Sequence, residues 1–393
     1  MVPQPGHGRL IVLAFLVLAI WLALFFARGG FWLCRERDDR SNPPAPNRWP
    51  RVAAVIPARD EADVIAASIG SLLSQDYPGD FRIVLVDDQS GDGTAQAAKT
   101  CAAASAAPGR LTVLQGAPLP SGWAGKLWAV SQGVHFAEKN FAPDYFLLTD
   151  ADIAHAPDNL RALIARAEQG SYALVSLMAL LRCESFAEKL LIPAFVYFFQ
   201  MLYPFRFVCD VRKKIAAAAG GCMLARADLL ARAGGVESIS GALIDDCALG
   251  ARMKRVGPIW LGLTRRVVSL RPYPHFDDIR KMVARSAYAQ LHYSPWALAG
   301  ALTGMVLTYF APPLLALFAD GAPQACGIAA FALMSVTFWP IQRFYGLWGM
   351  RALTLPLIAA LYMVYTLDSA LQFRRGRGGM WKGRAQAHRT EGA

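Results

Sequence analysis

The chain has 393 residues, of which 55% are apolar and 18% charged, whereas an ordinary soluble domain has about 45–50% apolar and about 25% charged residues. This composition excludes a disordered chain, a collagen-like repeat and a small disulfide-stapled protein, and it favours a globular domain joined to membrane segments. The net charge of +11 suits nucleic acid, anionic lipid or a phosphorylated substrate as a partner. Seven isolated cysteines without a C-x-x-C pair fit a reducing compartment.

The N-terminal region, residues 1–50, contains an apolar run from Leu10 to Ala27, which is just long enough to span a bilayer. Arg9 precedes this run, and six arginines follow it between positions 28 and 51. Because basic residues stay on the cytoplasmic side, we expect the amino end outside and the rest of the chain inside the cytoplasm. A cleaved signal peptide is the alternative.

A Pro-rich linker, Ser41–Pro50, leads into residues 51–293, where short β-rich runs alternate with helical stretches. We expect strands at Val52–Pro57, Arg82–Asp87, Leu111–Gln115, Tyr145–Thr149 and Ala173–Met178, and helices at Ala62–Gln75, Thr94–Ala104 and Lys126–Lys139. Apolar strands separated by helices predict a parallel α/β sheet that binds its ligands at the carboxyl ends of the strands.

Residues 294–373 contain three further apolar segments, Trp296–Phe318, Ala325–Ile341 and Ala352–Leu371, and a basic tail follows at 374–393. Three crossings would place this tail outside, against the positive-inside rule, unless Pro312–Pro313 or the short middle segment makes one element re-entrant. An earlier aromatic stretch, Leu190–Val208, is expected to lie on the membrane surface, the alternative being a buried core helix.

Pairs of carboxylates follow the first two expected strands. Asp60 and Glu61 come after Pro57, and Asp87 and Asp88 end the second strand. A helix dipole or a turn explains some of these acids. It does not explain two adjacent carboxylates at the edge of a sheet where the hydroxyls or ring N–H of a ligand would bind.

Two further acidic pairs lie downstream. Asp150 and Asp152 leave a strand at spacing i, i+2, so both can face one ligand, and their hard oxygens suit Mg²⁺ or Mn²⁺ holding phosphate. On its own such a motif also fits an ordinary acidic turn. Asp245 and Asp246 begin an expected helix, where one acid could cap the helix and the other could serve as a general base.

Two smaller features accompany these acids. The turn at Gly220 and Gly221 lets the backbone approach a ligand closely. Lys126 is a candidate for phosphate binding, and a solvated surface lysine is the alternative. His135, His155 and His275 have no metal-ligand spacing and are expected to be structural or exposed, while Asp368 is expected to pair with Arg374 or Arg375 at the membrane surface.

The order of these motifs resembles glycosyltransferase family 2 over about residues 51–293, and strings such as GWAGK at 122–126 and GRGGMWKGR at 376–384 resemble its hopene-associated members. The resemblance implies a GT-A fold, which is an α/β domain with a Rossmann-like nucleotide-binding sheet. In this chain the domain would carry one N-terminal transmembrane helix and a C-terminal set of hydrophobic helices.

The resemblance also implies roles for individual residues. Pro57, Asp60, Glu61, Asp87, Asp88, Lys126, Asp150, Gly221, Arg285 and Gln290 would bind the nucleotide or another part of the substrates. Asp152, with Asp150, would hold Mg²⁺ or Mn²⁺, and Asp246 or its neighbour Asp245 would deprotonate the acceptor. Arg285 and Gln290 stand where many relatives carry Q-x-x-R-W, a signature of processive polysaccharide synthesis that is absent here.

The sequence therefore predicts a membrane-bound, inverting, metal-dependent glycosyltransferase. It would move a sugar from a nucleotide-diphosphate sugar, with a lean toward uridine, to a lipid acceptor such as a hopanoid, in a bacterial inner membrane with the catalytic domain facing the cytoplasm. The alternatives are a polysaccharide synthase, a polyprenyl-phosphate sugar transferase, and a non-catalytic nucleotide-binding scaffold. Nucleic acid is not an expected partner, because the basic residues cluster beside membrane segments.

Overall fold

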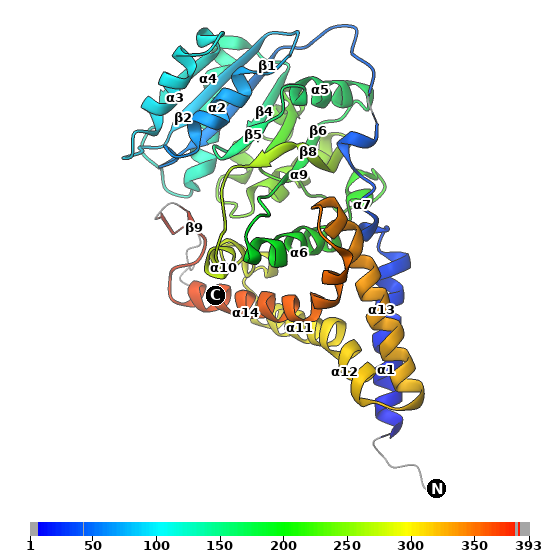
Figure 1. Ribbon diagram of the computed structural model, residues 1–393. Coiled ribbons are helices and arrows are strands. Elements are labelled where there is room, and N and C mark those ends of the chain that lie inside the picture. The colour runs from blue at the N-terminus through cyan, green and yellow to red at the C-terminus, as the bar shows by residue number, and fades with distance from the viewer. Residues whose placement is uncertain (1–6, 42, 382–383, 386–393) are drawn as a thin grey trace.

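An eight-stranded sheet organises the first two thirds of the computed structural model, which describes residues 7–41, 43–381 and 384–385 (Figure 1). Its strands are β1 (Val52–Ala58), β2 (Phe81–Asp87), β3 (Leu111–Gln115), β4 (Tyr145–Thr149), β5 (Ile153–His155), β6 (Leu174–Leu180), β7 (Cys222–Arg226) and β8 (Ile259–Ser269). The strand order is β3-β2-β1-β4-β7-β6-β8-β5. All five strands expected from the sequence are confirmed, with boundaries shifted by at most two residues.

The prediction of an all-parallel sheet is wrong for its second half. Strands β3, β2, β1 and β4 run parallel, but β7 is antiparallel to both β4 and β6, and β5 is antiparallel to β8. The pattern of apolar residues reports burial and not strand direction, and β7 reverses direction directly after the turn at Gly220 and Gly221.

Helices cover both faces of the sheet: α2 (Ile65–Leu73), α3 (Thr94–Ala103), α4 (Gly125–Phe141), α5 (Asn159–Gln169), α8 (Ala227–Arg232) and α9 (Asp245–Val256). Strand β1 is buried on both sides and divides its side chains between two cores. Ala54 and Ile56 pack with α2 and α5, whereas Ala53 and Val55 pack with α4, as the alternation of a strand requires.

A layer of helices lies beneath the sheet: α6 (Phe186–Leu202), α7 (Phe205–Cys209), α10 (Phe276–Ala284) and α14 (Leu355–Arg374). Three more elements extend away from it and pack together, namely α1 (His7–Leu22), α13 (Gly321–Phe344) and the kinked pair α11 (Pro295–Met305) and α12 (Ala311–Phe318). Four segments of the described chain are long and apolar enough to cross a membrane: Gly8–Ala27, Pro295–Phe318, Gly321–Phe344 and Gly349–Arg374.

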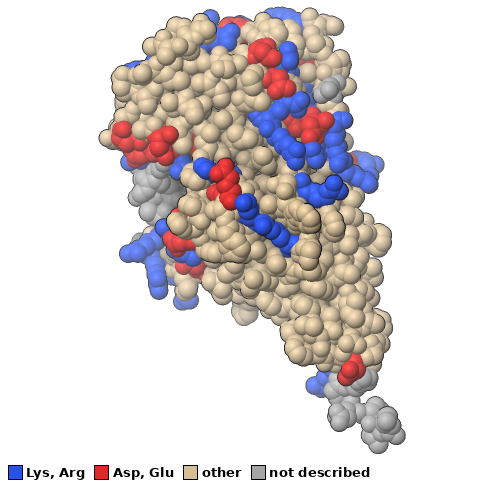
Figure 2. All heavy atoms as spheres, in the orientation of Figure 1, with Lys and Arg blue, Asp and Glu red and all other residues tan. Residues whose placement is uncertain are grey.

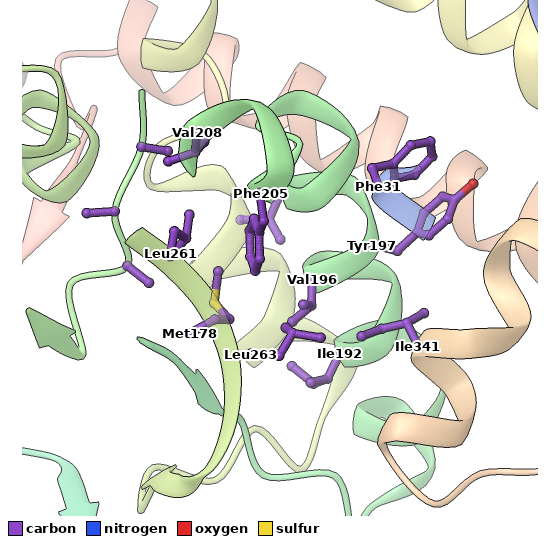
Figure 3. Packing of buried hydrophobic residues seen from close by; sticks show 14 of the residues in the cluster. Phe31, Met178, Ile192, Val196, Tyr197, Phe205, Val208, Leu261, Leu263 and Ile341 are labelled. Atoms are coloured by element: carbon purple, nitrogen blue, oxygen red, sulfur yellow. The ribbon is translucent and has the colours of Figure 1, made fainter. Parts of the chain in front are cut away.

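Helix α6 joins the sheet to the helices that could span a membrane (Figure 3). On one side Ile192 and Val196 face Leu263 of β8, and on the other Tyr197 packs on Phe31 and donates or accepts a 2.9 Å hydrogen bond with Thr337 of α13. The segment 190–208 is therefore a buried core helix and not, as expected, a helix on the membrane surface. Its apolar, aromatic composition fits both environments, so composition alone favoured the wrong one.

Charge is distributed unevenly over the surface. Figure 2 shows that acidic and basic side chains gather around the sheet and its junction with the helices, while the extension formed by α1, α12 and α13 is nearly free of them except at its far end. Large apolar side chains are exposed there, among them Phe15, Leu317 and Trp339. Such an uncharged apolar surface is typical of protein that contacts lipid.

The predicted partner of Asp368 is wrong. Asp368 pairs with Arg280 of α10 and accepts a 2.6 Å hydrogen bond from Gln372, while Arg374 and Arg375 are exposed. The sequence suggested a partner a few residues away in the chain, but the side chain of Asp368 faces α10. Two basic residues of the expected tail, Lys382 and Arg389, lie outside the described residues.

Candidate active site

Lys126 joins two of the predicted acidic pairs. It lies in the first turn of α4, and its Nζ is 2.8 Å from Oδ1 of Asp150, after β4, and 3.0 Å from Oδ2 of Asp245, at the start of α9. Burial opposes the charged form of the lysine, but the two carboxylates outweigh it and raise the pKa of Lys126 above its ordinary value. The alternative of a solvated surface lysine is wrong.

Asp246 faces the turn at Gly220. Its Oδ2 accepts a 3.0 Å hydrogen bond from the backbone N–H of Gly220, and its Oδ1 accepts one of 2.7 Å from Cys247. A Cβ atom at position 220 would lie 3.4 Å from Nζ of Lys126 and 3.6 Å from Oδ2 of Asp246, which are ordinary van der Waals distances, so the turn packs closely against both side chains. Burial and the adjacent Asp245 raise the pKa of Asp246 to about 6.

A hydrogen bond from Thr149 of β4 holds the turn at Gly221 in place. Thr149 donates a 2.7 Å hydrogen bond to the carbonyl of Gly221 and lies 3.0 Å from Nε2 of His155. Burial lowers the pKa of His155 to about 4, so the imidazole is neutral. The expectation of a structural role for this histidine agrees with its position behind the site.

Arg271, which the sequence analysis did not single out, joins two further acids. Its Nε is 2.8 Å from Oδ2 of Asp152, and its Nη2 is 2.6 and 2.7 Å from the two oxygens of Glu61. Although burial disfavours the charge, Asp152 and Glu61 raise the pKa of Arg271. The only sequence signal is an arginine two residues after β8, a strand that was not predicted either.

The acids at the ends of β1 and β2 lie beside this cluster and hold their loops together. Asp60 accepts a 2.9 Å hydrogen bond from the N–H of Gly91, and Asp87 accepts one of 3.2 Å from Ser90. Asp88 is buried, 3.7 Å from the guanidinium of Arg59. Their placement at the carboxyl edge of the parallel strands agrees with the sequence prediction, and their contacts here are structural.

Pro57 is buried in β1 and lines a cavity of about 20 Å³ together with Lys126, Asp150, Gly220 and Asp245. Such a volume is about the size of one or two waters. The cavity therefore leaves little free space beside the Lys126 ammonium, which lies between Asp150 and Asp245.

Gln290 and Arg285 lie outside the cluster. Gln290 donates a 2.7 Å hydrogen bond to the hydroxyl of Tyr203, whose pKa is raised to about 12 by burial and by the nearby Cys247 of α9. Arg285 is exposed. Its charge influences the pKa of Tyr273, as do the charges of Asp152 and Arg271. Gln290 is therefore linked to α9 through the side chain of Tyr203, and Arg285 lies at the protein surface.

The donor set suits a divalent cation that is shared with a phosphate ligand. Asp150 lies near Asp152 and Asp245, and burial together with these two acids raises its pKa despite Lys126. The described residues contain no group of three or more Asp, Glu, His or Cys arranged to hold a metal ion by themselves. Mg²⁺ and Mn²⁺ often bind one or two carboxylates and take their other ligands from phosphates and water, so Asp150 and Asp152 fit that mode.

Comparison with known proteins identifies the fold. The sequence model of the family described as Glycosyl transferase family 2 matches residues 53–234, which include Asp60, Asp88, Asp152 and Gly221 but end before Asp245. A mannosyltransferase from Pyrobaculum calidifontis, solved with GDP-Man and Mn²⁺, is similar with a TM-score of 0.52 and 19% identity, over 92% of this chain and 98% of that one. The chain therefore has the GT-A fold.

Two further structures are more distant. TarS residues 1–349 from S. aureus, in complex with UDP-GlcNAc, is 14% identical with a TM-score of 0.38, over 85% of this chain and 95% of that one. Glucosyl-3-phosphoglycerate synthase from Mycobacterium tuberculosis, with Mg²⁺ and UDP, is 18% identical with a TM-score of 0.40, over 62% of this chain and 79% of that one. A search of curated proteins gives no match.

Replacing Lys126 by Met should destabilise the protein by about 1–3 kcal/mol near pH 8, because Asp150 and Asp245 then lack their common cation. Breaking a fully buried ion pair costs about 3–5 kcal/mol. The smaller value is expected here because these side chains are partly exposed to water. Without the cation the pKa of Asp150 rises further above its unfolded value, so lowering the pH toward 5 should shrink the deficit. Thermal unfolding of the detergent-purified protein measures both effects. Lys99→Met, at an exposed position of α3, is the control, and a deficit that grows at acid pH would contradict this account.

Proposed function

We propose that the protein is an integral-membrane, inverting glycosyltransferase that transfers a sugar from a nucleotide-diphosphate sugar to the hydroxyl of a membrane lipid. The observation that carries this proposal is the position of Asp246. It lies at the carboxyl edge of a GT-A sheet, next to the acids predicted to hold a metal and a diphosphate, in the first turn of α9, a helix drawn between the sheet and the helix layer in Figure 1. The resemblance to hopene-associated members of family 2 suggests a hopanoid or a similar isoprenoid as the lipid.

The donor would bind along the ends of β1, β2 and β4. The family match covers these strands, and the similar mannosyltransferase was solved with GDP-Man and Mn²⁺. In this chain Asp60, Glu61 and Asp88 would face the nucleoside, and Asp150 and Asp152 would hold Mg²⁺ or Mn²⁺ against the diphosphate. The metal would stabilise the negative charge that the leaving diphosphate acquires, without a proton transfer.

The acceptor hydroxyl would lose its proton to Asp246. The backbone N–H groups of Gly220 and Cys247 hold this carboxylate in one orientation, and a pKa of about 6 keeps it ionised yet basic near neutral pH. A single in-line displacement by that hydroxyl inverts the anomeric centre and needs no covalent enzyme intermediate, unlike the two-step route of retaining glycosidases.

A short series of contacts supports a lipid acceptor. Tyr203, at the end of α6, lies against Cys247, the neighbour of Asp246, and accepts a hydrogen bond from Gln290. The loop that carries Gln290 packs on α14, where Tyr293 stacks on Phe373 with ring centroids 4.3 Å apart. Asp246, the proposed base, is therefore connected through Tyr203 and the loop that carries Gln290 to α14, a helix with an exposed apolar face. Such an apolar face suits an acceptor that enters from the bilayer.

The proposal is tested by incubating the detergent-purified full chain with a panel of sugar nucleotides, with Mn²⁺ or Mg²⁺ and then with chelator, with and without extracted membrane lipid. We expect release of nucleoside diphosphate that requires metal, rises with lipid and yields a lipid bearing one sugar. Asp152→Asn should abolish release, and Asp80→Asn, at an exposed acid paired with Arg82, should not. A ladder of products would indicate a polysaccharide synthase, and nucleotide binding without release would indicate a scaffold.

The pH dependence distinguishes Asp246 from Asp245 as the base. A carboxylate with a raised pKa is protonated and inactive at acid pH, so kcat/KM should rise as the pH passes through about 6. Asp246→Asn should reduce the rate by about 10²–10⁴-fold. Asp245→Asn removes a like charge and should move the acid limb to lower pH while activity remains. A greater loss in Asp245→Asn than in Asp246→Asn would exchange the two roles.

We also propose that α14 lies on the bilayer surface and does not cross it. Polar side chains along its inner face contact the helix layer: Tyr362 donates to the carbonyl of Leu191, and Asp368 pairs with Arg280. Its outer face carries Leu357, Val364 and Leu371, seven residues apart and each at least half exposed. One apolar face and one face with polar contacts are typical of a helix in the membrane interface.

This arrangement would resolve the conflict between the C-terminal apolar segments and the positive-inside rule, in which three crossings after the sheet domain place the basic tail outside. With α14 on the surface, the crossings are α1, the pair α11–α12, and α13; of the pair, α12 packs against α1 and α13 in the part of the molecule farthest from the sheet (Figure 1). Three crossings place the start of α1 on one side of the membrane, and the sheet domain and the basic segment after α14 on the other. The arginines that follow α1 and those at 374, 375 and 377 then share the cytoplasmic side, as the positive-inside rule requires.

Reporter fusions test this topology. Green fluorescent protein fused after Ala393 should fluoresce in a bacterial host, and alkaline phosphatase at the same point should be inactive, because both report a cytoplasmic carboxyl end. Phosphatase fused after Asp320, between α12 and α13, should be active and is the matched control. Active phosphatase at the carboxyl end would mean that α14 crosses the membrane.

A further inference from the structure

Arg271 joins two acids from distant parts of the chain. Its guanidinium bridges Glu61 and Asp152, residues that follow β1 and β4 and are far from it in the sequence. Arg266 makes a similar bridge, to Asp38 and Asp158, whereas Arg182 and Arg226 pair with an acid two residues away. The side chains of Glu61 and Asp152 are 9% and 18% exposed, so Arg271 offsets acids that are largely removed from water.

The backbone around Arg271 is held on both sides while its side chain reaches into the site. The N–H of Leu270 donates a 2.8 Å hydrogen bond to the carbonyl of Asp152, and the N–H of Tyr273 donates one of 2.7 Å to Glu188 of α6. Because these anchors fix the main chain, a change of partner at the guanidinium needs only side-chain rotation. The position of the arginine relative to the end of β4 stays the same.

The charges of the cluster favour such a change if a metal binds. The cluster contains five acids, Glu61, Asp150, Asp152, Asp245 and Asp246, against two cations, Lys126 and Arg271. A divalent cation on the carboxylate of Asp152 would repel the guanidinium that contacts its Oδ2, and so would weaken that ion pair. A nucleotide diphosphate that arrives with the metal brings anionic oxygens to the same place, and the planar guanidinium can contact two phosphate oxygens at once.

We propose that Arg271 is an exchangeable counter-cation of the donor site. It holds Asp152 and Glu61 when no donor is bound, releases Asp152 to the metal when the donor enters, and then binds the diphosphate while Glu61 continues to hold it. This inference rests on the proposed function, since it assumes that Asp152 is a metal ligand. It assigns to Arg271 both a competition with the metal and a contact with the nucleotide.

These two roles predict opposite effects of one substitution. Arg271→Gln removes the positive charge that competes for Asp152, so Mn²⁺ alone should bind several-fold more tightly. The same variant lacks the contact with the diphosphate, so GDP and UDP in the presence of saturating Mn²⁺ should bind about tenfold more weakly or worse, as expected for a lost hydrogen bond to a charged group. A bridge that only stabilises the fold would weaken both ligands together or change neither.

The experiment titrates the detergent-purified full chain with Mn²⁺, followed by the electron paramagnetic resonance of free Mn²⁺, and then with GDP and UDP by calorimetry. Arg226→Gln, at a half-buried arginine that pairs with Asp228, is the matched control and should leave both affinities unchanged. Arg271→Lys keeps a charge but lacks the planar guanidinium that can contact two phosphate oxygens side by side, so it should show the same opposite shifts, smaller in size, even where Arg271→Gln folds poorly.

The outcomes separate this inference from the proposed function. If the wild type binds no Mn²⁺ even with GDP or UDP present, or binds it as tightly after Asp152→Asn, the metal-dependent function itself is wrong and the role of Arg271 is wrong with it. If the wild type binds Mn²⁺ through Asp152 but both Arg271 variants leave Mn²⁺ affinity unchanged or lower it, only the exchange at Arg271 is overturned. Tighter Mn²⁺ binding with unchanged GDP and UDP binding would also overturn it, because the contact with the diphosphate would be absent.

Discussion

The excess of negative charge at one edge of the sheet is the constraint on which the rest of the site depends. Five carboxylates converge there from the ends of two strands and the start of α9, in a place where partial burial strengthens their repulsion. Lys126 and Arg271 make this arrangement compatible with folding. Each cation contacts acids from two different elements, so the same ion pairs that reduce the repulsion also fix β1, β4, α4 and α9 relative to one another.

A second constraint connects this edge to the membrane helices. Helix α6 packs against the sheet and against α13, so the sheet domain and the helix layer share one hydrophobic core. A flexible attachment would let the base move relative to the bilayer surface. Here Tyr197, Thr337 and Phe31 place α6 at a fixed position, and the contact of Tyr203 with α9 extends that position to Asp246. The proposed acceptor site therefore has a fixed position relative to the helices that are proposed to cross the bilayer.

Much of this could be predicted from the sequence, because strands, apolar runs and acids at strand ends are local signals. The strand Leu111–Gln115 was predicted to the residue, and the acids Asp150 and Asp152 were placed correctly after β4. What depends on contacts between distant segments could not be predicted. Arg271 has no distinctive neighbours, the partner of Asp368 lies on another helix, and the direction of β7 leaves no trace in an apolar pattern. The interior position of α6 was missed because buried and membrane-facing helices have similar compositions.

The two substrates of the proposed reaction differ in how a protein can recognise them, and the site is divided accordingly. A nucleotide-diphosphate sugar is charged and comes from water, so its recognition uses Lys126, Arg271 and the acids that a metal would bridge. A lipid alcohol offers one hydroxyl and a large apolar body, so charge gives it little specificity, and the side chain of Tyr203 lies close to Asp246 and Cys247. Asp246 stands between these halves, as the proposed transfer requires, because the acceptor must lose its proton where the phosphate field ends and the apolar surface begins.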